Sequence, residues 1–176
     1  MIKVSYFPGC TLRTKAKQLD LYARRCAEVL GVELCELEDW QCCGGVFVSN
    51  NDEIASKLSS VRALIAAKEA ERPLVTVCSA CHNVIKQTNY QITNDETFRN
   101  RANLYLAQDK EKREPYSGET KVMHYFELLR DVVGFDKIKE KVVNPLTGRK
   151  IAAYYGCLLL RPGKVMAFDD PENPAI

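Results

Sequence analysis

Short apolar stretches alternate with segments of helical periodicity along the first half of this chain. Ile2 to Phe7, Val32 to Leu37 and Leu74 to Val77 are rich in apolar, β-branched and aromatic residues, which predicts three strands. Between them the apolar residues recur at helical spacing, which predicts one helix from about Lys15 to Leu30 and another from about Asp52 to Ala70. The pattern therefore indicates strands and helices in alternation.

The two predicted helices each carry one apolar stripe, and the second has a candidate N-cap in Asn50 or Asn51. The first stripe consists of Leu19, Tyr22, Cys26, Val29 and Leu30, and the second of Ile54, Leu58, Val61 and Ile65.

The second half of the chain continues the alternation. A helix is expected after Cys81, a charged loop over Ala107 to Thr120, and strands on both sides of a further helix. The remaining predicted elements are a helix over Glu96 to Leu106, a strand over Lys121 to His124, a helix near Phe126 to Val133 and a strand over Lys150 to Tyr155.

Alternation at this spacing predicts an α/β fold with a mostly parallel sheet and helices on both of its faces. In such a sheet the carboxyl ends of all strands lie at one edge, which is where ligands of open α/β sheets bind. The cysteines at positions 10, 42, 43, 78 and 81 all follow predicted strands, as do His124 and Cys157. We therefore expect the cysteine loops to gather at the C-terminal edge of the strands.

Composition and charge argue against nucleic-acid-binding and membrane-inserted proteins. The 176 residues are 46% hydrophobic and 27% charged, with a net charge of +2 and both signs interspersed, so no nucleic-acid partner is expected. No apolar run is long enough to span a membrane and no leader segment precedes Cys10, which predicts a cytoplasmic protein without membrane insertion.

A partial internal repeat links the two ends of the chain. The segment from Lys3 to Arg13 resembles that from Lys150 to Arg161, since both read as strand, glycine and cysteine. We therefore predict a first domain over residues 1–149 and the start of a second, truncated copy over residues 150–176. An incomplete copy leaves surface without a partner, so self-association into a homo-oligomer is also expected.

The eight cysteines carry the candidate chemistry. In a reducing compartment, clustered cysteines bind metal or perform redox reactions more often than they form disulfides. One cysteine, 31 residues, Cys-Cys-Gly-Gly, 32 residues and Cys-x-x-Cys follow one another. Structural zinc takes four ligands, whereas several irons bridged by sulfide accommodate five thiolates. We therefore predict a cluster site formed by Cys10, Cys42, Cys43, Cys78 and Cys81.

Details of these residues support that interpretation. Cys42 and Cys43 are adjacent, so they are expected to bind different irons or to let one sulfur bridge two. Cys78 and Cys81 open a predicted helix, whose free N–H groups favour thiolate over thiol. Among the remaining residues we expect core positions for Cys26, Cys35 and Trp40, a helix-surface position for His82, and backbone roles for Gly9, Gly44 and Gly45.

The cysteine pattern resembles the cysteine-rich CCG domain of the B-type subunit of heterodisulfide reductase, in its N-terminal portion. The resemblance rests on Cys10, on Cys42-Cys43-Gly44-Gly45 and on Cys78-Ser79-Ala80-Cys81, and it extends to Cys157 at the start of the second copy. It implies a noncubane [4Fe-4S] cluster that passes electrons to a disulfide of two thiol coenzymes. It also implies a ferredoxin-like iron-sulfur subunit and an upstream flavoprotein as partners.

The resemblance implies that the chain is an oxidoreductase subunit. The second cysteine motif is represented only by Cys157, so we expect this chain to be inactive by itself. His124 is the candidate catalytic residue, because a histidine at the functional edge can donate a proton to the leaving thiolate.

Two alternatives from other classes stay open. The first is a structural or interaction module in which four of the cysteines bind zinc, and an isolated chain can also carry zinc or an empty site in place of the cluster. The second is a metal-free thiol oxidoreductase with a reversible disulfide between Cys78 and Cys81.

Overall fold

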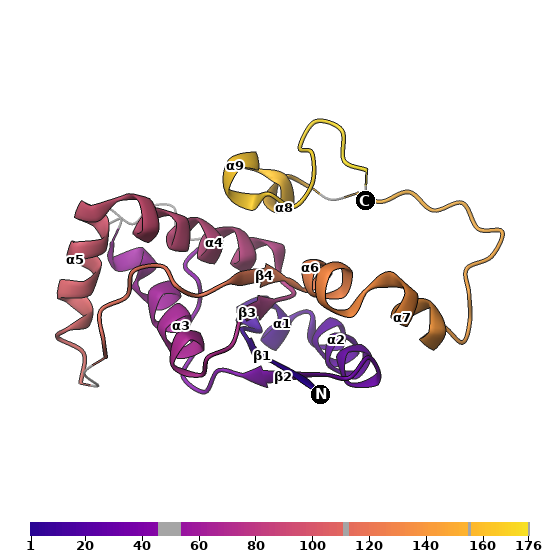
Figure 1. The fold of residues 1–176 in the computed structure, drawn as a ribbon, viewed down its shortest axis with the longest axis horizontal. Coiled ribbons are helices and arrows are strands. Elements are labelled where there is room, and N and C mark those ends of the chain that lie inside the picture. The colour runs from indigo at the N-terminus through magenta and orange to yellow at the C-terminus, as the bar shows by residue number, and fades with distance from the viewer. Residues whose placement is uncertain (46–53, 111–112, 155, 176) are drawn as a thin grey trace.

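One parallel sheet lies at the centre of the protein, whose computed structural model describes residues 1–45, 54–110, 113–154 and 156–175. Within these residues the sheet has the strand order β2-β1-β3-β4, and all neighbouring strands run parallel (Figure 1). The strands are β1 (Ile2–Tyr6), β2 (Val32–Glu36), β3 (Leu74–Thr76) and β4 (Val122–His124). The predicted α/β fold with a parallel sheet is confirmed.

Helices cover the sheet, and all the elements described after β4 are helical. The first half contains α1 (Gly9–Thr14), α2 (Lys17–Val29), the 3₁₀ turn η1 (Ala55–Lys57), α3 (Leu58–Glu69), α4 (Ser79–Asn94) and α5 (Glu96–Leu106). The second half contains α6 (Tyr125–Glu127), the π-helical turn η2 (Leu128–Val133), α7 (Phe135–Lys141), α8 (Cys157–Leu160) and α9 (Gly163–Met166).

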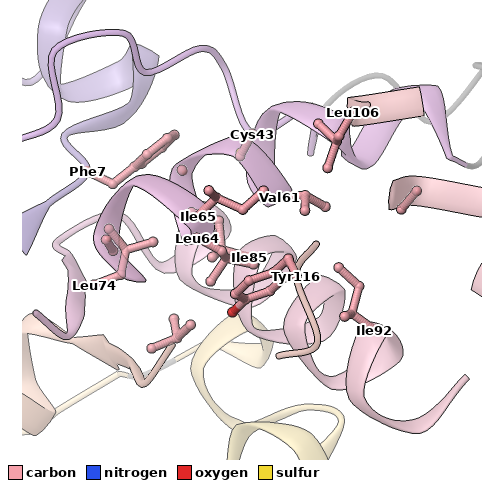
Figure 2. Close-up of a cluster of buried hydrophobic side chains, with 14 of the residues drawn as sticks. Phe7, Cys43, Val61, Leu64, Ile65, Leu74, Ile85, Ile92, Leu106 and Tyr116 are labelled. Carbon is pink, nitrogen blue, oxygen red and sulfur yellow. The ribbon is translucent and has the colours of Figure 1, made fainter. Parts of the chain in front are cut away.

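Two apolar layers lie on opposite faces of the sheet, because successive strand residues point to opposite sides. Leu74 and Val122 join the larger layer, which also contains buried side chains of α3, α4 and α5. Figure 2 shows this layer, with Leu64 of α3 among its fully buried side chains. Val75 and Met123 pack into the smaller layer, formed with α2, α6 and η2. Helices therefore cover both faces, as predicted.

The first helical segment differs from its prediction in two ways. Cys10 lies inside α1 rather than in a loop, and a break at Ala16 separates α1 from α2. The predicted stripe is also wrong, since Leu19, Tyr22 and Val29 are exposed. α2 instead turns a face with Asp20, Ala23 and Ala27 toward the sheet, because Asp20 accepts a hydrogen bond from Tyr6 and the two alanines allow close packing.

The second helical segment follows its prediction where it is described. η1 and α3 replace one continuous helix, and Ile54, Val61 and Ile65 are buried as expected. The candidate caps Asn50 and Asn51 lie outside the described residues.

The strand predicted for Lys150 to Tyr155 is absent from residues 150–154, where the chain is exposed and without regular structure. A lone strand is not stable without a neighbour to pair with, and the structure places none beside it within the described residues. Helix α8 then begins at Cys157 and packs with α9 against α4 (Figure 1). Asn83 of α4 donates hydrogen bonds to the carbonyl oxygens of Leu158 and Arg161, both at 2.8 Å. The division at residue 150 stays a prediction.

Candidate metal centre

Strand ends position the five cysteines predicted to form the site. Cys10 lies in α1, just after β1, and Cys42 and Cys43 lie in the loop that follows β2. Cys78 is the N-cap of α4, directly after β3, and Cys81 lies in the first turn of that helix. Because β1, β2 and β3 are parallel neighbours, these segments leave the sheet in the same direction.

The five sulfur atoms form one continuous series of contacts. The Sγ atoms of Cys10 and Cys42 lie 3.8 Å apart. Those of Cys43 and Cys81 lie 3.5 Å apart. The thiol of Cys42 also hydrogen-bonds with Cys43, and that of Cys81 with Cys78. The order of contact is therefore Cys10, Cys42, Cys43, Cys81 and Cys78, which we call the sulfur series.

The sulfur series runs from the surface into the core. Cys10 is exposed, Cys42 and Cys78 are half-buried, and Cys43 and Cys81 are buried. Cys43 and Cys81 are part of the larger apolar layer, in which Figure 2 labels Cys43. The inner part of the series is thus fixed in the core, and the site meets solvent at Cys10.

Hydrogen bonding favours thiolate at two members of the series. The Cys81 thiol lowers the pKa of Cys78 to about 6, with further help from the backbone N–H groups of Cys81 and Ala80 at the start of α4. Cys81 likewise lowers the pKa of Cys43 to about 7, and the Gly45 N–H adds to this effect. The pKa of Cys81 itself is raised, because its hydrogen bonds to Cys43 and Cys78 hold its proton.

Gly9 leaves the space in which the Cys81 sulfur lies. A Cβ atom at position 9 would lie 2.7 Å from the Cys81 Sγ atom, and Gly9 has a φ of +76°. Both the close approach and the backbone angle therefore require glycine. The predicted backbone role of Gly9 is confirmed.

The Gly9→Ala variant is expected to displace Cys81 and to lower the free energy of unfolding by about 1–2 kcal/mol, because the residue is strained and overpacked. Chemical denaturation of the metal-free protein measures the loss. Gly148→Ala is the matched control, since its φ is +77° but nothing lies within 4 Å of the added Cβ atom. Equal losses in the two variants would show that the contact with Cys81 contributes nothing.

The cysteine sulfurs of the series suit a metal that prefers sulfur ligands. Two thiolates on one tetrahedral ion with metal-sulfur bonds of about 2.3 Å are about 3.8 Å apart. The Cys10–Cys42 and Cys43–Cys81 separations of 3.8 and 3.5 Å are close to that value. Within the described residues, no three His, Cys, Asp or Glu side chains are grouped so as to hold a single ion. The short sulfur separations within the series include those of Cys10–Cys42 and Cys43–Cys81.

His82 of α4 and His124 at the end of β4 lie together on the face of α4 that is turned toward the sheet. Their ring centroids are 5.4 Å apart, and both rings are buried. The prediction that His82 is a surface residue is wrong, because α4 turns this face toward β4 and α6. Burial lowers the pKa of His82 to about 3 and that of His124 to about 4. Both imidazoles are therefore neutral at pH 7.

Glu127 joins the two histidines to α4, and the sequence pattern does not single it out. Its carboxylate accepts a hydrogen bond from the His124 backbone N–H at 2.6 Å and lies 3.5 Å from the His82 Nε2 atom. It also pairs with Lys86 at 3.2 Å. Together with His124 it forms a capping box at α6, so the His-x-x-Glu spacing is the signal that could have found it.

Cysteines outside the sulfur series occupy other surfaces. Cys26 is exposed on α2 and Cys35 is half-buried in β2, so the prediction of two core thiols is wrong for Cys26. Cys26 is exposed because α2 buries the face with Asp20, Ala23 and Ala27 instead of the predicted stripe. Cys157 is exposed at the first position of α8.

A cavity of about 690 Å³ lies beside the loop that leads to Cys42. Leu37, Trp40 and Gln41 of that loop line one side, and Arg62 of α3 lines another. The Arg62 guanidinium donates to both carboxylate oxygens of Asp109, at 2.7 and 2.8 Å. The lining includes none of the five cysteines, so the cavity is separate from the sulfur series.

Comparisons with known proteins agree with the cysteine pattern. Residues 4–86 match the family described as CCG, the cysteine-rich domain. The chain is 31% identical over 170 residues to the 8-methylmenaquinol:fumarate reductase membrane anchor subunit of Wolinella succinogenes. It is 30% identical over 176 residues to the B-type subunit of the ferredoxin:CoB-CoM heterodisulfide reductase of Methanosarcina mazei.

These matches include nearly all of this chain but only part of the relatives. They cover 97% and 99% of the chain, respectively, and 57% of each relative. A protein of Archaeoglobus profundus, named as similar to the B-type subunit, is 26% identical over 179 residues, covering the whole chain and 59% of that protein. The chain therefore spans somewhat more than half the length of these relatives. The resemblance to the B-type subunit of heterodisulfide reductase is confirmed.

The helices also bear on membrane insertion. In the part of the chain that the structure describes, every helix is too short or too polar to cross a bilayer.

Proposed function

We propose that the protein passes electrons through a noncubane [4Fe-4S] cluster to a disulfide of thiol coenzymes or a related substrate, because residues 4–86 match the CCG cysteine-rich domain family. Its relatives are subunits of reductases, which supports an iron-sulfur oxidoreductase role. The relative from Methanosarcina mazei is named for the CoB-CoM heterodisulfide, and this name supports the disulfide as substrate.

The sulfur series is the observation that supports the proposal. Three segments far apart in sequence bring five thiols into contact, with Sγ–Sγ separations of 3.8 Å for Cys10–Cys42 and 3.5 Å for Cys43–Cys81. Five thiolates exceed what one zinc ion takes but suit several bridged irons. We therefore assign Cys10, Cys42, Cys43, Cys78 and Cys81 as the ligands.

The bound cluster would supply one-electron transfer and an iron that can take a sulfur of the substrate. The chain itself contributes the surroundings. Cys43 and Cys81 exclude water from the core side, and Cys10 leaves the other side open to solvent. The backbone N–H groups at the start of α4 bond the Cys78 sulfur, and such bonds raise the reduction potential of a centre.

The reaction consumes two electrons and two protons for each disulfide and releases two thiols. We propose that a ferredoxin-like iron-sulfur subunit supplies the electrons and that a flavoprotein supplies that subunit. These partners follow from the family resemblance, and the location in the cytoplasm stays a prediction from the sequence. The formation of a homo-oligomer stays a prediction.

His124 stays a proposed proton donor, and its surroundings define what that role requires. The Phe126 N–H donates to the His124 Nδ1 atom at 3.2 Å, so the ring proton lies on Nε2 and faces the Val77 carbonyl oxygen at 3.0 Å. Donation to a substrate would require that second hydrogen bond to break. Water at the exposed Cys10 end is the other source of protons.

A zinc-binding structural module that uses four of the cysteines is the second candidate. The observation that favours it is the pairwise sulfur spacing, which also matches two thiolates on one zinc ion. The fifth thiol, however, would then have no ion to bind.

The substrate class can be tested on anaerobically reconstituted protein by electron paramagnetic resonance. The reduced protein is mixed with 2-hydroxyethyl disulfide or with fumarate, the oxidant in the name of one relative. We expect a spectral change with the disulfide and none with fumarate, without steady-state turnover in either case. A change with fumarate alone would contradict the proposed substrate.

A further inference from the structure

Glu36, the last residue of β2, accepts hydrogen bonds from three separate segments and is called the hub below. Its Oε1 atom accepts hydrogen bonds from an Arg13 guanidinium nitrogen and from the Trp40 indole Nε1, the latter at 3.1 Å. Its Oε2 atom accepts from Arg24 at 2.5 Å. One partly buried carboxylate thus joins α1, α2 and the loop that follows β2.

A second set of contacts fixes the hub to the sheet. Arg24 also donates to the buried Asp20 at 3.0 Å, and its guanidinium lies 4.6 Å from the centre of the Tyr6 ring. The Tyr6 hydroxyl donates a hydrogen bond to the Asp20 carboxylate at 2.6 Å. Tyr6 is fully buried and is the register partner of Glu36 in the neighbouring strand. The position of the Glu36 carboxylate is therefore set by groups that cannot easily move.

Two of the partners of Glu36, Arg13 and Trp40, belong to the segments that carry Cys10 and Cys42. Arg13 follows Cys10 within the six-residue helix α1. Trp40 precedes Cys42 in the loop, and its ring packs against Phe7 with 5.4 Å between centroids. The Cys10 and Cys42 sulfurs, 3.8 Å apart, come from these two segments and touch each other at the exposed end of the series.

We propose that Glu36 is a positioning residue that holds Cys10 and Cys42 together at the open end of the sulfur series. Its relevance to a cluster rests on the function proposed above, but the spacing of the two thiols is a property of the chain alone.

Removal of the carboxylate has a direct physical consequence. Arg13 would lose its anionic partner at the end of β2, Arg24 would keep Asp20, and the Trp40 N–H would lose its acceptor. Segment α1 and the loop would then no longer be bonded to the same carboxylate, so they could move apart. The inner pair, Cys43 and Cys81, has its place in the apolar core and would stay together.

Disulfide formation in the metal-free protein measures both spacings in one sample. Mild oxidation with diamide, followed by peptide mass spectrometry, gives the yields of the Cys10–Cys42 and Cys43–Cys81 disulfides. In Glu36→Ala we expect the initial rate for Cys10–Cys42 to fall about tenfold, because several charge-assisted hydrogen bonds are lost. The rate for Cys43–Cys81 should stay within about twofold of the wild-type rate, because its surroundings are unchanged.

Two further variants separate positioning from general damage. Glu33→Ala is the matched control in the same strand, where Glu33 pairs with Lys3 at the surface at 3.2 Å. It should oxidise as the wild type does. Trp40→Phe keeps an aromatic ring but removes one donor to Glu36, so an intermediate rate is expected for the outer pair.

Two results would overturn the proposal: an unchanged Cys10–Cys42 rate in Glu36→Ala, or equal losses at both pairs in a variant whose circular dichroism is native. The result is independent of iron. If the wild-type protein takes up no iron on reconstitution, the proposed function fails while the role of Glu36 can still hold.

Discussion

The Cys81→Ala variant is expected to lose the cluster. Cys81 links Cys43 and Cys78 in the sulfur series, since it contacts Cys43 at 3.5 Å and hydrogen-bonds with Cys78. Its removal takes away a ligand and leaves the two neighbouring thiols without their shared partner. After anaerobic reconstitution, we expect iron to fall from about four per chain to less than about one, as metal and sulfide analysis would show.

Cys26→Ala is the control for this substitution, because Cys26 is exposed on α2 and outside the series. It should retain the iron content of the wild type. Full iron content in Cys81→Ala, or the same loss in both variants, would contradict the assignment of the ligands.

The Leu64→Ala variant is expected to lower the free energy of unfolding by roughly 2–5 kcal/mol, the usual cost of removing a fully buried leucine side chain. Leu64 of α3 has no exposed surface and packs in the layer that also contains Cys43 and Cys81 (Figure 2). A loss of this size is a large part of the stability of a small domain. Urea denaturation of the metal-free protein measures it.

Leu104→Ala provides the comparison, since Leu104 lies on α5 with 68% of its surface exposed. Its effect should stay within about 0.5 kcal/mol. A similar small effect for Leu64→Ala would mean that the layer between α3 and the sheet is not packed as the structure shows.

The strands and the convergence of the cysteines could be predicted from the sequence because each depends on a local signal. β1 and β3 are short runs containing apolar and β-branched residues, and they end a few residues before Cys10 and Cys78. Parallel pairing then determines the common edge, since every strand-helix-strand crossover returns the chain in the same direction. The ligand role of the five cysteines has the same origin and stays a prediction until the bound metal is measured.

Features that depend on tertiary packing could not be predicted. The face of α2 that is buried contains the charged residue Asp20, which is accommodated by a hydrogen bond from Tyr6, a residue distant in sequence. Periodicity alone favours the face with Leu19 and Tyr22, which are exposed. The same limit applies to His82, because only the position of β4 and α6 decides which side of α4 is covered. The hub at Glu36 has no sequence signal because its three donors come from separate segments.

The composition of the metal centre is the most direct test of the central claim that the five sulfurs jointly bind a polynuclear cluster. Iron, inorganic sulfide and zinc should be quantified in the same anaerobically prepared sample, together with its electron paramagnetic resonance spectrum. We expect about four irons and a similar amount of sulfide per chain, with little zinc. One zinc per chain without sulfide would contradict the claim and would favour the structural module instead.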